Sequence, residues 1–310
     1  MATFARGRHW GSLLLVLACG LTASCAGRSS TPPPQGEGNV TRALTAADRI
    51  RLDQAESVLV QQCMARQQFR YWVPPAPKAV ERRPFEVVLD DLIWAKQYGY
   101  GGLIRAEENR QARTDPNIAY RRSLDKADLD RYLVALKGGS DRRVVTAKLP
   151  TGMTVQHALG GCEAHAKQEL YGDGQTWFRL DRFVSNLLPL YMPQVAQDRR
   201  YIAALAAWST CMRKRGHAFR SPAEIRQTLP RLTDGLAPAQ AHPVEVKLAV
   251  AEASCARESA LGTTARSLAA SYRAPVEARF ADDLATHRAL QRTALQRAVE
   301  LVPDLPSTGG

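Results

Sequence analysis

Apolar residues recur at helical spacing over most of the chain beyond residue 45. Ile50, Ala55 and Leu59 fall on one face of a helix, and Thr45 and Asp48 have the spacing of a capping box at its start. We expect helices at about residues 45–69, 85–98, 103–113, 126–137, 162–170, 176–188 and 199–215, one starting at Pro222, and nearly continuous helix over 243–301 with a kink or restart at Pro275.

A strand pattern occurs at one place only. Residues 144–149 and 153–157 carry it, and Pro150-Thr151-Gly152 between them predicts a turn, so the two runs read as a hairpin. The sequence therefore predicts an all-α protein with one small β-hairpin. We divide it into a helical unit with the hairpin (45–172) and a helical unit with long C-terminal helices (173–302).

The first 24 residues are typical of a signal peptide. Arg6 and Arg8 precede a short apolar run at 13–18, which is too short to span a bilayer. The run Leu21-Thr22-Ala23-Ser24-Cys25 resembles a lipobox, a resemblance that implies cleavage before Cys25 and acylation of that residue. Cleavage after Ala26 is the alternative, and it would give a free secreted protein.

The residues next to these predicted elements are rich in Pro, Ser and Gly. Residues 25–44 predict a flexible linker that holds a domain off a surface, and residues 303–310 predict a flexible tail. Leu305-Pro306-Ser307-Thr308-Gly309 matches the sortase recognition pentapeptide, but no apolar span or basic tail follows it. We read the match as coincidence.

Basic residues outnumber acidic ones and give a formal net charge of +12. Cleavage before Cys25 lowers it to +10, because Arg6 and Arg8 are the only fully charged residues removed. For an exported protein the natural anions are lipid headgroups and wall polymers, so we expect no nucleic-acid partner.

Six cysteines are present, and four of them remain after Cys19 leaves with the signal and Cys25 is acylated: Cys63, Cys162, Cys211 and Cys255. An even number is expected of a disulfide framework in an oxidising compartment, and four cysteines allow three pairings. No Cys/His spacing resembles a zinc site, and we expect no metal and no cofactor.

An internal resemblance chooses among the pairings. Cys63-Met64 and Cys211-Met212 each end a helix, each is followed by an aromatic residue and a Pro-rich exit, and each precedes one later helical cysteine. We read these as two related units. They predict the disulfides Cys63–Cys162 and Cys211–Cys255.

The second copy, Cys211-Met212-Arg213 followed by Gly216, Phe219 and Pro222, resembles the Cys-Met-Arg-x-x-Gly-x-x-Phe-x-x-Pro signature of exported lipoproteins of GC-rich Gram-positive bacteria. The likeness covers about residues 199–260, and the first copy holds Gln67-Gln68 near the Gly position. The resemblance implies an extracytoplasmic location and a disulfide-stapled helical fold. It implies no activity.

Candidate catalytic residues are few. His165 and Glu169 lie one helical turn apart but lack a third ligand, and we read them as a solvated helix face. The Ser123-x-x-Lys126 spacing matches penicillin-recognising enzymes, yet a Ser before Asp125 is usually an N-cap. The aromatic residues Tyr71, Trp72, Trp94, Tyr98 and Tyr100 suit sugar stacking, although packing between helices is the commoner use.

Two classes of function follow from these features. The preferred one is a non-enzymatic, membrane-tethered lipoprotein that binds an envelope protein complex or an anionic wall polymer, and the alternative is an envelope hydrolase acting on wall or peptide substrates. A concave pocket that gathers Ser123, His157, Glu163, His165 and Glu169 would favour the hydrolase. Outward, separated positions would favour the binding module.

Overall fold

The computed structural model describes residues 43–76, 87–140 and 143–304. The expected signal peptide, Cys25, nearly all of the linker and the pentapeptide at 305–309 lie outside these described residues. Within them, no helix combines the length and the apolar character that crossing a membrane requires.

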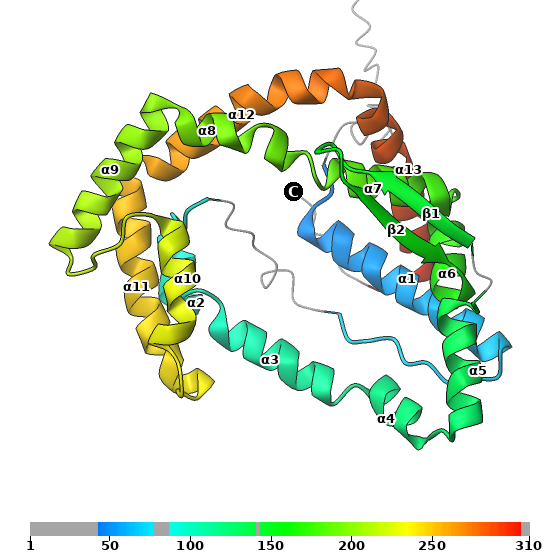
Figure 1. The fold of residues 1–310 in the computed structure, drawn as a ribbon. Helices are drawn as coiled ribbons and strands as arrows, with labels where there is room; N and C mark the ends of the chain where they lie inside the picture. Colours follow the sequence, from blue (N-terminus) through cyan, green and yellow to red (C-terminus); the bar gives the residue numbers. More distant parts are fainter. Residues whose placement is uncertain (1–42, 77–86, 141–142, 305–310) are drawn as a thin grey trace, which may run out of the picture. The chain divides into compact units, whose positions relative to one another are not determined.

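Helices make up most of the described chain, and two short strands are the exception (Figure 1). The elements are α1 (Ala46–Arg66), α2 (Leu92–Tyr98), α3 (Gly102–Arg113), α4 (Pro116–Ser123), α5 (Lys126–Lys137), β1 (Arg143–Lys148), β2 (Thr154–Leu159), α6 (Gly161–Tyr171), α7 (Gly174–Val184), the 3-10 helix η2 (Leu188–Leu190), α8 (Met192–Gln197), α9 (Arg199–Lys214), α10 (Pro222–Leu232), α11 (Pro238–Glu258), α12 (Leu261–Arg279) and α13 (Ala281–Leu301). The prediction of an all-α fold with one hairpin is confirmed. The strands pair antiparallel, with Lys148 opposite Thr154 beside the turn.

Helix boundaries follow local capping. Thr45 and Asp48 form the expected capping box, with Asp48 N–H donating to Thr45 Oγ1 at 3.1 Å. Helix α2 begins at Leu92 rather than near residue 85, because Asp91 accepts from the N–H groups of Ile93 and Trp94 and so fixes the first turn there.

The long C-terminal pattern divides at positions other than the expected one. Pro275 lies inside α12, and the breaks fall at Ser259-Ala260 and at Phe280. Ala260 has φ 55°, a left-handed conformation that ends α11 and redirects the chain into α12. The expected restart at Pro275 is therefore wrong, since α12 continues through that residue.

Two groups of helices have cores of their own. One core joins α1, α5, α6, α7 and α13, and the other joins α9, α10, α11 and the start of α12, with α2 packed on α11 through a smaller third core. The boundary expected at residue 172 does not separate these groups. Helices α7 and α13 pack with α1 and α6, whereas α2 and α3 pack on α11, and residues from Leu44 onward form one compact unit.

Each group contains one disulfide. Cys63 of α1 is bonded to Cys162 of α6, and Cys211 of α9 is bonded to Cys255 of α11, with Cα–Cα distances of 5.5 and 5.6 Å. The predicted pairing is confirmed. Both bridges join helices that are distant in sequence, so each fixes a tertiary contact rather than a local turn.

Helices α1 and α9 end in the same way. In α1 the N–H of Phe69 donates to Met64 O at 2.9 Å, and in α9 the N–H of His217 donates to Met212 O at 2.9 Å. The left-handed residue in the first case is Gln68 (φ 66°) and in the second is Gly216 (φ 82°).

The segments that leave these two helices are tied back alike. Gln61 Nε2 donates to the Tyr71 carbonyl at 2.9 Å, and Ser209 Oγ donates to the Phe219 carbonyl at 2.9 Å. The residue that corresponds to Phe219 is therefore Tyr71. This likeness covers the helix ends, and a repeat of whole units stays a prediction.

Candidate functional site

The candidate hydrolase residues make separate local contacts. Ser123 ends α4 and donates from Oγ to the Tyr120 carbonyl at 2.7 Å. Asp125, not Ser123, is the N-cap of α5, so the expected capping role of Ser123 was wrong. Lys126 lies beyond that helix break, exposed and paired with Asp130 at 2.7 Å. The Ser-x-x-Lys geometry of one continuous helix is therefore not formed.

The two histidine candidates also differ in their surroundings. His165 Nδ1 lies 3.5 Å from Glu169 Oε2 on the outer face of α6, and both side chains are about half exposed. His157 of β2 stacks on Phe178 with ring centroids 5.0 Å apart, and burial lowers its pKa. Neither histidine lines any of the three described grooves, a pattern that suits a solvated face better than a catalytic centre.

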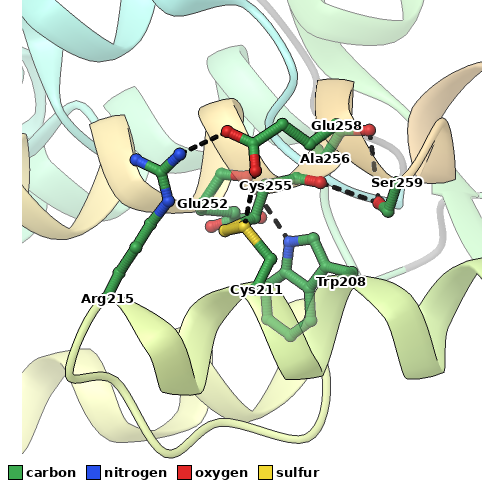
Figure 2. A network of polar contacts seen from close by, with 8 residues as sticks. All are labelled: Trp208, Cys211, Arg215, Glu252, Cys255, Ala256, Glu258 and Ser259. Atoms are coloured by element: carbon green, nitrogen blue, oxygen red, sulfur yellow. Dashed lines mark hydrogen bonds and ion pairs between the residues drawn. A yellow bond between two sulfur atoms is a disulfide. The ribbon is translucent and has the colours of Figure 1, made fainter.

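An open groove lies beside the Cys211–Cys255 disulfide, between α9 and the end of α11. Figure 2 shows Arg215 reaching across from the end of α9 to form an ion pair with Glu258. The lining residues are Ala206, Ala207, Thr210, Cys211, Lys214, Arg215, Glu258 and Ser259. Two cations line the groove, and whereas Arg215 is paired with Glu258, Lys214 is exposed and has no carboxylate partner among the described residues.

Metal binding at this groove conflicts with the oxidised sulfurs. Cys211, Cys255 and Glu258 place their ligand atoms within 4.8 Å of one another, the one such set among the described residues. Glu258 Oε2 lies 3.2 Å from Cys211 Sγ. A disulfide sulfur is not the thiolate that a metal requires, so this cluster serves structure while the disulfide is intact.

Three residues before Cys255, α11 carries a buried carboxylate, Glu252, that the sequence analysis did not identify. Glu252 is fully buried, and it accepts from the Leu89 N–H at 3.0 Å and from the Tyr100 hydroxyl at 2.6 Å. Arg226 Nη2 lies 3.5 Å away, and Trp208 Nε1 donates to the Glu252 carbonyl at 3.4 Å (Figure 2). Burial raises the pKa of Glu252, and both burial and this carboxylate raise the pKa of Tyr100.

A second buried carboxylate, Glu245, lies two turns earlier on the same face of α11. It accepts from the N–H groups of Tyr100 and Gly102 at 3.2 and 3.0 Å. The sequence signal for these buried acids was their spacing, since Glu245 and Glu252 lie seven residues apart and so fall on the apolar stripe of an Ala-rich helix. Their hydrogen-bond donors, Leu89, Tyr100 and Gly102, flank α2 and begin α3, so we assign these acids to holding α2 and α3 onto α11.

Four of the five aromatic candidates pack inside the protein. Trp94 is buried, Tyr98 and Tyr100 pack against the α2–α11 core, and Tyr71 packs against the core around α1. Trp72 is the exception, because it belongs to none of the described cores.

Exposed cations gather after both Cys-Met pairs. Arg66 and Arg70 follow Cys63, and Arg213 and Lys214 follow Cys211. None of these four has a carboxylate partner among the described residues.

Searches of protein-family models, curated proteins and solved structures find no match to the chain.

Proposed function

We propose that this chain is an exported, lipid-anchored, non-enzymatic module that binds anionic surfaces of the cell envelope. The observation that carries the proposal is the set of exposed, unpaired cations at the ends of α1 and α9, on a chain of formal charge +12. Charges held in solvent without a carboxylate partner stay available for a polyanion.

Two further features support an envelope location. The lipobox-like residues before Cys25 suit an acyl anchor, and both disulfides suit an oxidising compartment. The hydrolase alternative has less support, because Ser123 bonds to its own helix and neither candidate histidine lines a described groove.

Vesicle binding tests the electrostatic part of the proposal. The full chain with Cys25→Ser, which removes the proposed acyl anchor, is mixed with phosphatidylglycerol vesicles and with neutral phosphatidylcholine vesicles. We expect binding to the anionic vesicles only, with a steep loss as salt rises from 0.1 M to 1 M, because the screening length falls from about 10 Å to about 3 Å.

Charge variants supply matched controls for that experiment. Arg213→Gln with Lys214→Gln removes two exposed cations at the end of α9 and should weaken binding. Asp282→Asn with Asp283→Asn removes two exposed acids at the start of α13 and should strengthen binding. Binding that ignores both salt and these variants would refute an electrostatic surface.

A separate measurement tests the anchor. Cells fed radiolabelled fatty acid should label the wild-type chain and leave Cys25→Ser unlabelled and released into the medium. Equal release of both forms would contradict acylation at Cys25.

A further inference from the structure

The extended segment that follows α1 borders a groove of about 410 Å³. Its lining consists of Gln61, Ala65, Phe69, Arg70, Tyr71 and Trp72. Three aromatic side chains, one cation and one amide line it, and no carboxylate does. This combination attracts a ligand that has both a flat apolar face and negative charge.

Side-chain amides of two helices, α1 and α4, hold the backbone of this segment in place. Gln61 Nε2 donates to the Tyr71 carbonyl at 2.9 Å. The buried Asn117 of α4 accepts from the Trp72 N–H at 3.0 Å and donates to the Trp72 carbonyl at 2.8 Å. The groove is therefore formed before any ligand arrives, which lowers the entropy cost of binding.

The three aromatic rings of the groove have different roles. Phe69 and Tyr71 pack against the core around α1, and Phe69 meets Tyr132 edge to face at 5.4 Å. Trp72 touches Tyr120 edge to face at 5.6 Å and stays partly exposed. Trp72 lines the groove and is partly exposed, so its indole can offer the uncovered part of its surface to a ligand.

Arg70 and Arg66 supply positive charge on this side of the protein. Both are exposed, and neither has a carboxylate partner among the described residues. A guanidinium binds a carboxylate or phosphate through paired hydrogen bonds, and an unpaired one loses no existing ion pair when it does so. Arg131 also lies near the groove, with its guanidinium carbon 6.0 Å from the Phe69 ring centre, but it is ion-paired with Asp128 and adds no unpaired charge.

We infer that this groove binds an anionic saccharide, whose ring stacks on Trp72 while its carboxylate or phosphate pairs with Arg70. The inference rests on the proposed envelope function and narrows it to one site and one ligand class. Stacking with a phosphate contact would also suit single-stranded nucleic acid. The two disulfides favour an extracytoplasmic saccharide, and an oligonucleotide is therefore one arm of the test.

The test is titration of the full chain with three probes under physiological salt. These are hyaluronate hexasaccharide, a neutral N-acetylglucosamine hexamer and oligothymidylate. Binding is followed by calorimetry and by tryptophan fluorescence, since Trp94, Trp177 and Trp208 are buried and Trp72 is the partly exposed indole of the described residues. We expect the hyaluronate to bind tightest and to change the fluorescence.

Single variants locate the site. Arg70→Gln should weaken hyaluronate binding about tenfold, the lower end of the range for a hydrogen bond to a charged group. Trp72→Phe should keep the fold and part of the affinity but lose the fluorescence change. Arg231→Gln on α10 removes an equally exposed, unpaired cation and should leave binding within about twofold.

Each other outcome refutes one of the two proposals. Equal weakening by Arg70→Gln and Arg231→Gln would overturn the site while the diffuse electrostatic function survives. Tighter binding of oligothymidylate than of hyaluronate would overturn the ligand class. Absence of salt-sensitive binding to every polyanion would overturn the proposed function itself.

Discussion

Replacing Glu252 by Ala tests whether one buried carboxylate holds the segment before α2 and the turn before α3 onto α11. Glu252 accepts from the Leu89 N–H at 3.0 Å and from the Tyr100 hydroxyl at 2.6 Å, and Arg226 lies 3.5 Å away. No part of the Glu252 side chain reaches solvent. Solvent therefore does not compete for these donors in the folded wild-type protein.

The expected loss follows from what the substitution leaves behind. Removing Glu252 leaves the Leu89 N–H and the Tyr100 hydroxyl buried without their acceptor, which costs about 1–3 kcal/mol for each unsatisfied group. Tyr100→Phe removes a single donor and should cost about 1–1.5 kcal/mol. Glu252→Gln keeps the volume and one acceptor oxygen, and we expect an intermediate loss.

Guanidinium unfolding monitored by far-ultraviolet circular dichroism at pH 7 measures these differences. Glu300→Ala is the matched control, since Glu300 is exposed near the end of α13 and should change the free energy of unfolding by less than about 0.5 kcal/mol. A loss below about 1 kcal/mol for Glu252→Ala would refute the reasoning. It would show that the α2–α11 contact is held by apolar packing alone.

Three further predictions concern stability. Replacing both cysteines of Cys63–Cys162, which spans 99 residues, should lower the free energy of unfolding by about 4.7 kcal/mol, and replacing both of Cys211–Cys255, which spans 44, by about 4.0 kcal/mol. Denaturant unfolding should therefore show the variant without Cys63–Cys162 to be the less stable of the two. Gln68→Gly should stabilise the protein by about 1 kcal/mol by relieving the left-handed conformation, whereas Gly216→Gln should destabilise it by a similar amount; equal unfolding midpoints would contradict this. Because burial raises the pKa of Glu252, its protonated form favours folding, so the stability advantage of wild type over Glu252→Gln should be largest below about pH 4 and shrink as pH rises; a gap that widens with pH would reverse the assigned sign.

Much of the fold was predictable from local rules. The period of the apolar residues gives most of the helices, Thr45 and Asp48 give the start of α1, and the turn residues between the strands give the hairpin. The two Cys-Met helix ends were enough to choose one disulfide pairing of three. Each of these signals acts over a few residues or through a distinctive residue type.

Tertiary partners were less predictable, for a physical reason. Apolar stripes of Ala and Leu resemble one another, so the sequence does not state that α13 packs on α1 rather than on α12. Helix α2 is short and begins where Asp91 caps it, whereas the periodic signal continued upstream. The buried acids of α11 fit no surface pattern, because their partners are backbone N–H groups about 150 residues away.

The contact between α1 and α13 has a consequence for the order of events during biosynthesis. Ala294 and Ala298 of α13 belong to the same buried core as Leu59 and Met64 of α1. During synthesis from the N-terminal end, both cysteines of the Cys63–Cys162 disulfide are available once α6 has been made. Helix α13, which completes the same core, is made much later, because it lies near the end of the described residues. The apolar face of α1 therefore stays partly exposed until α13 has been made, near the end of synthesis. Such a nascent chain is a natural client for a holdase chaperone, and a chain cut before α13 should be degraded rather than accumulate.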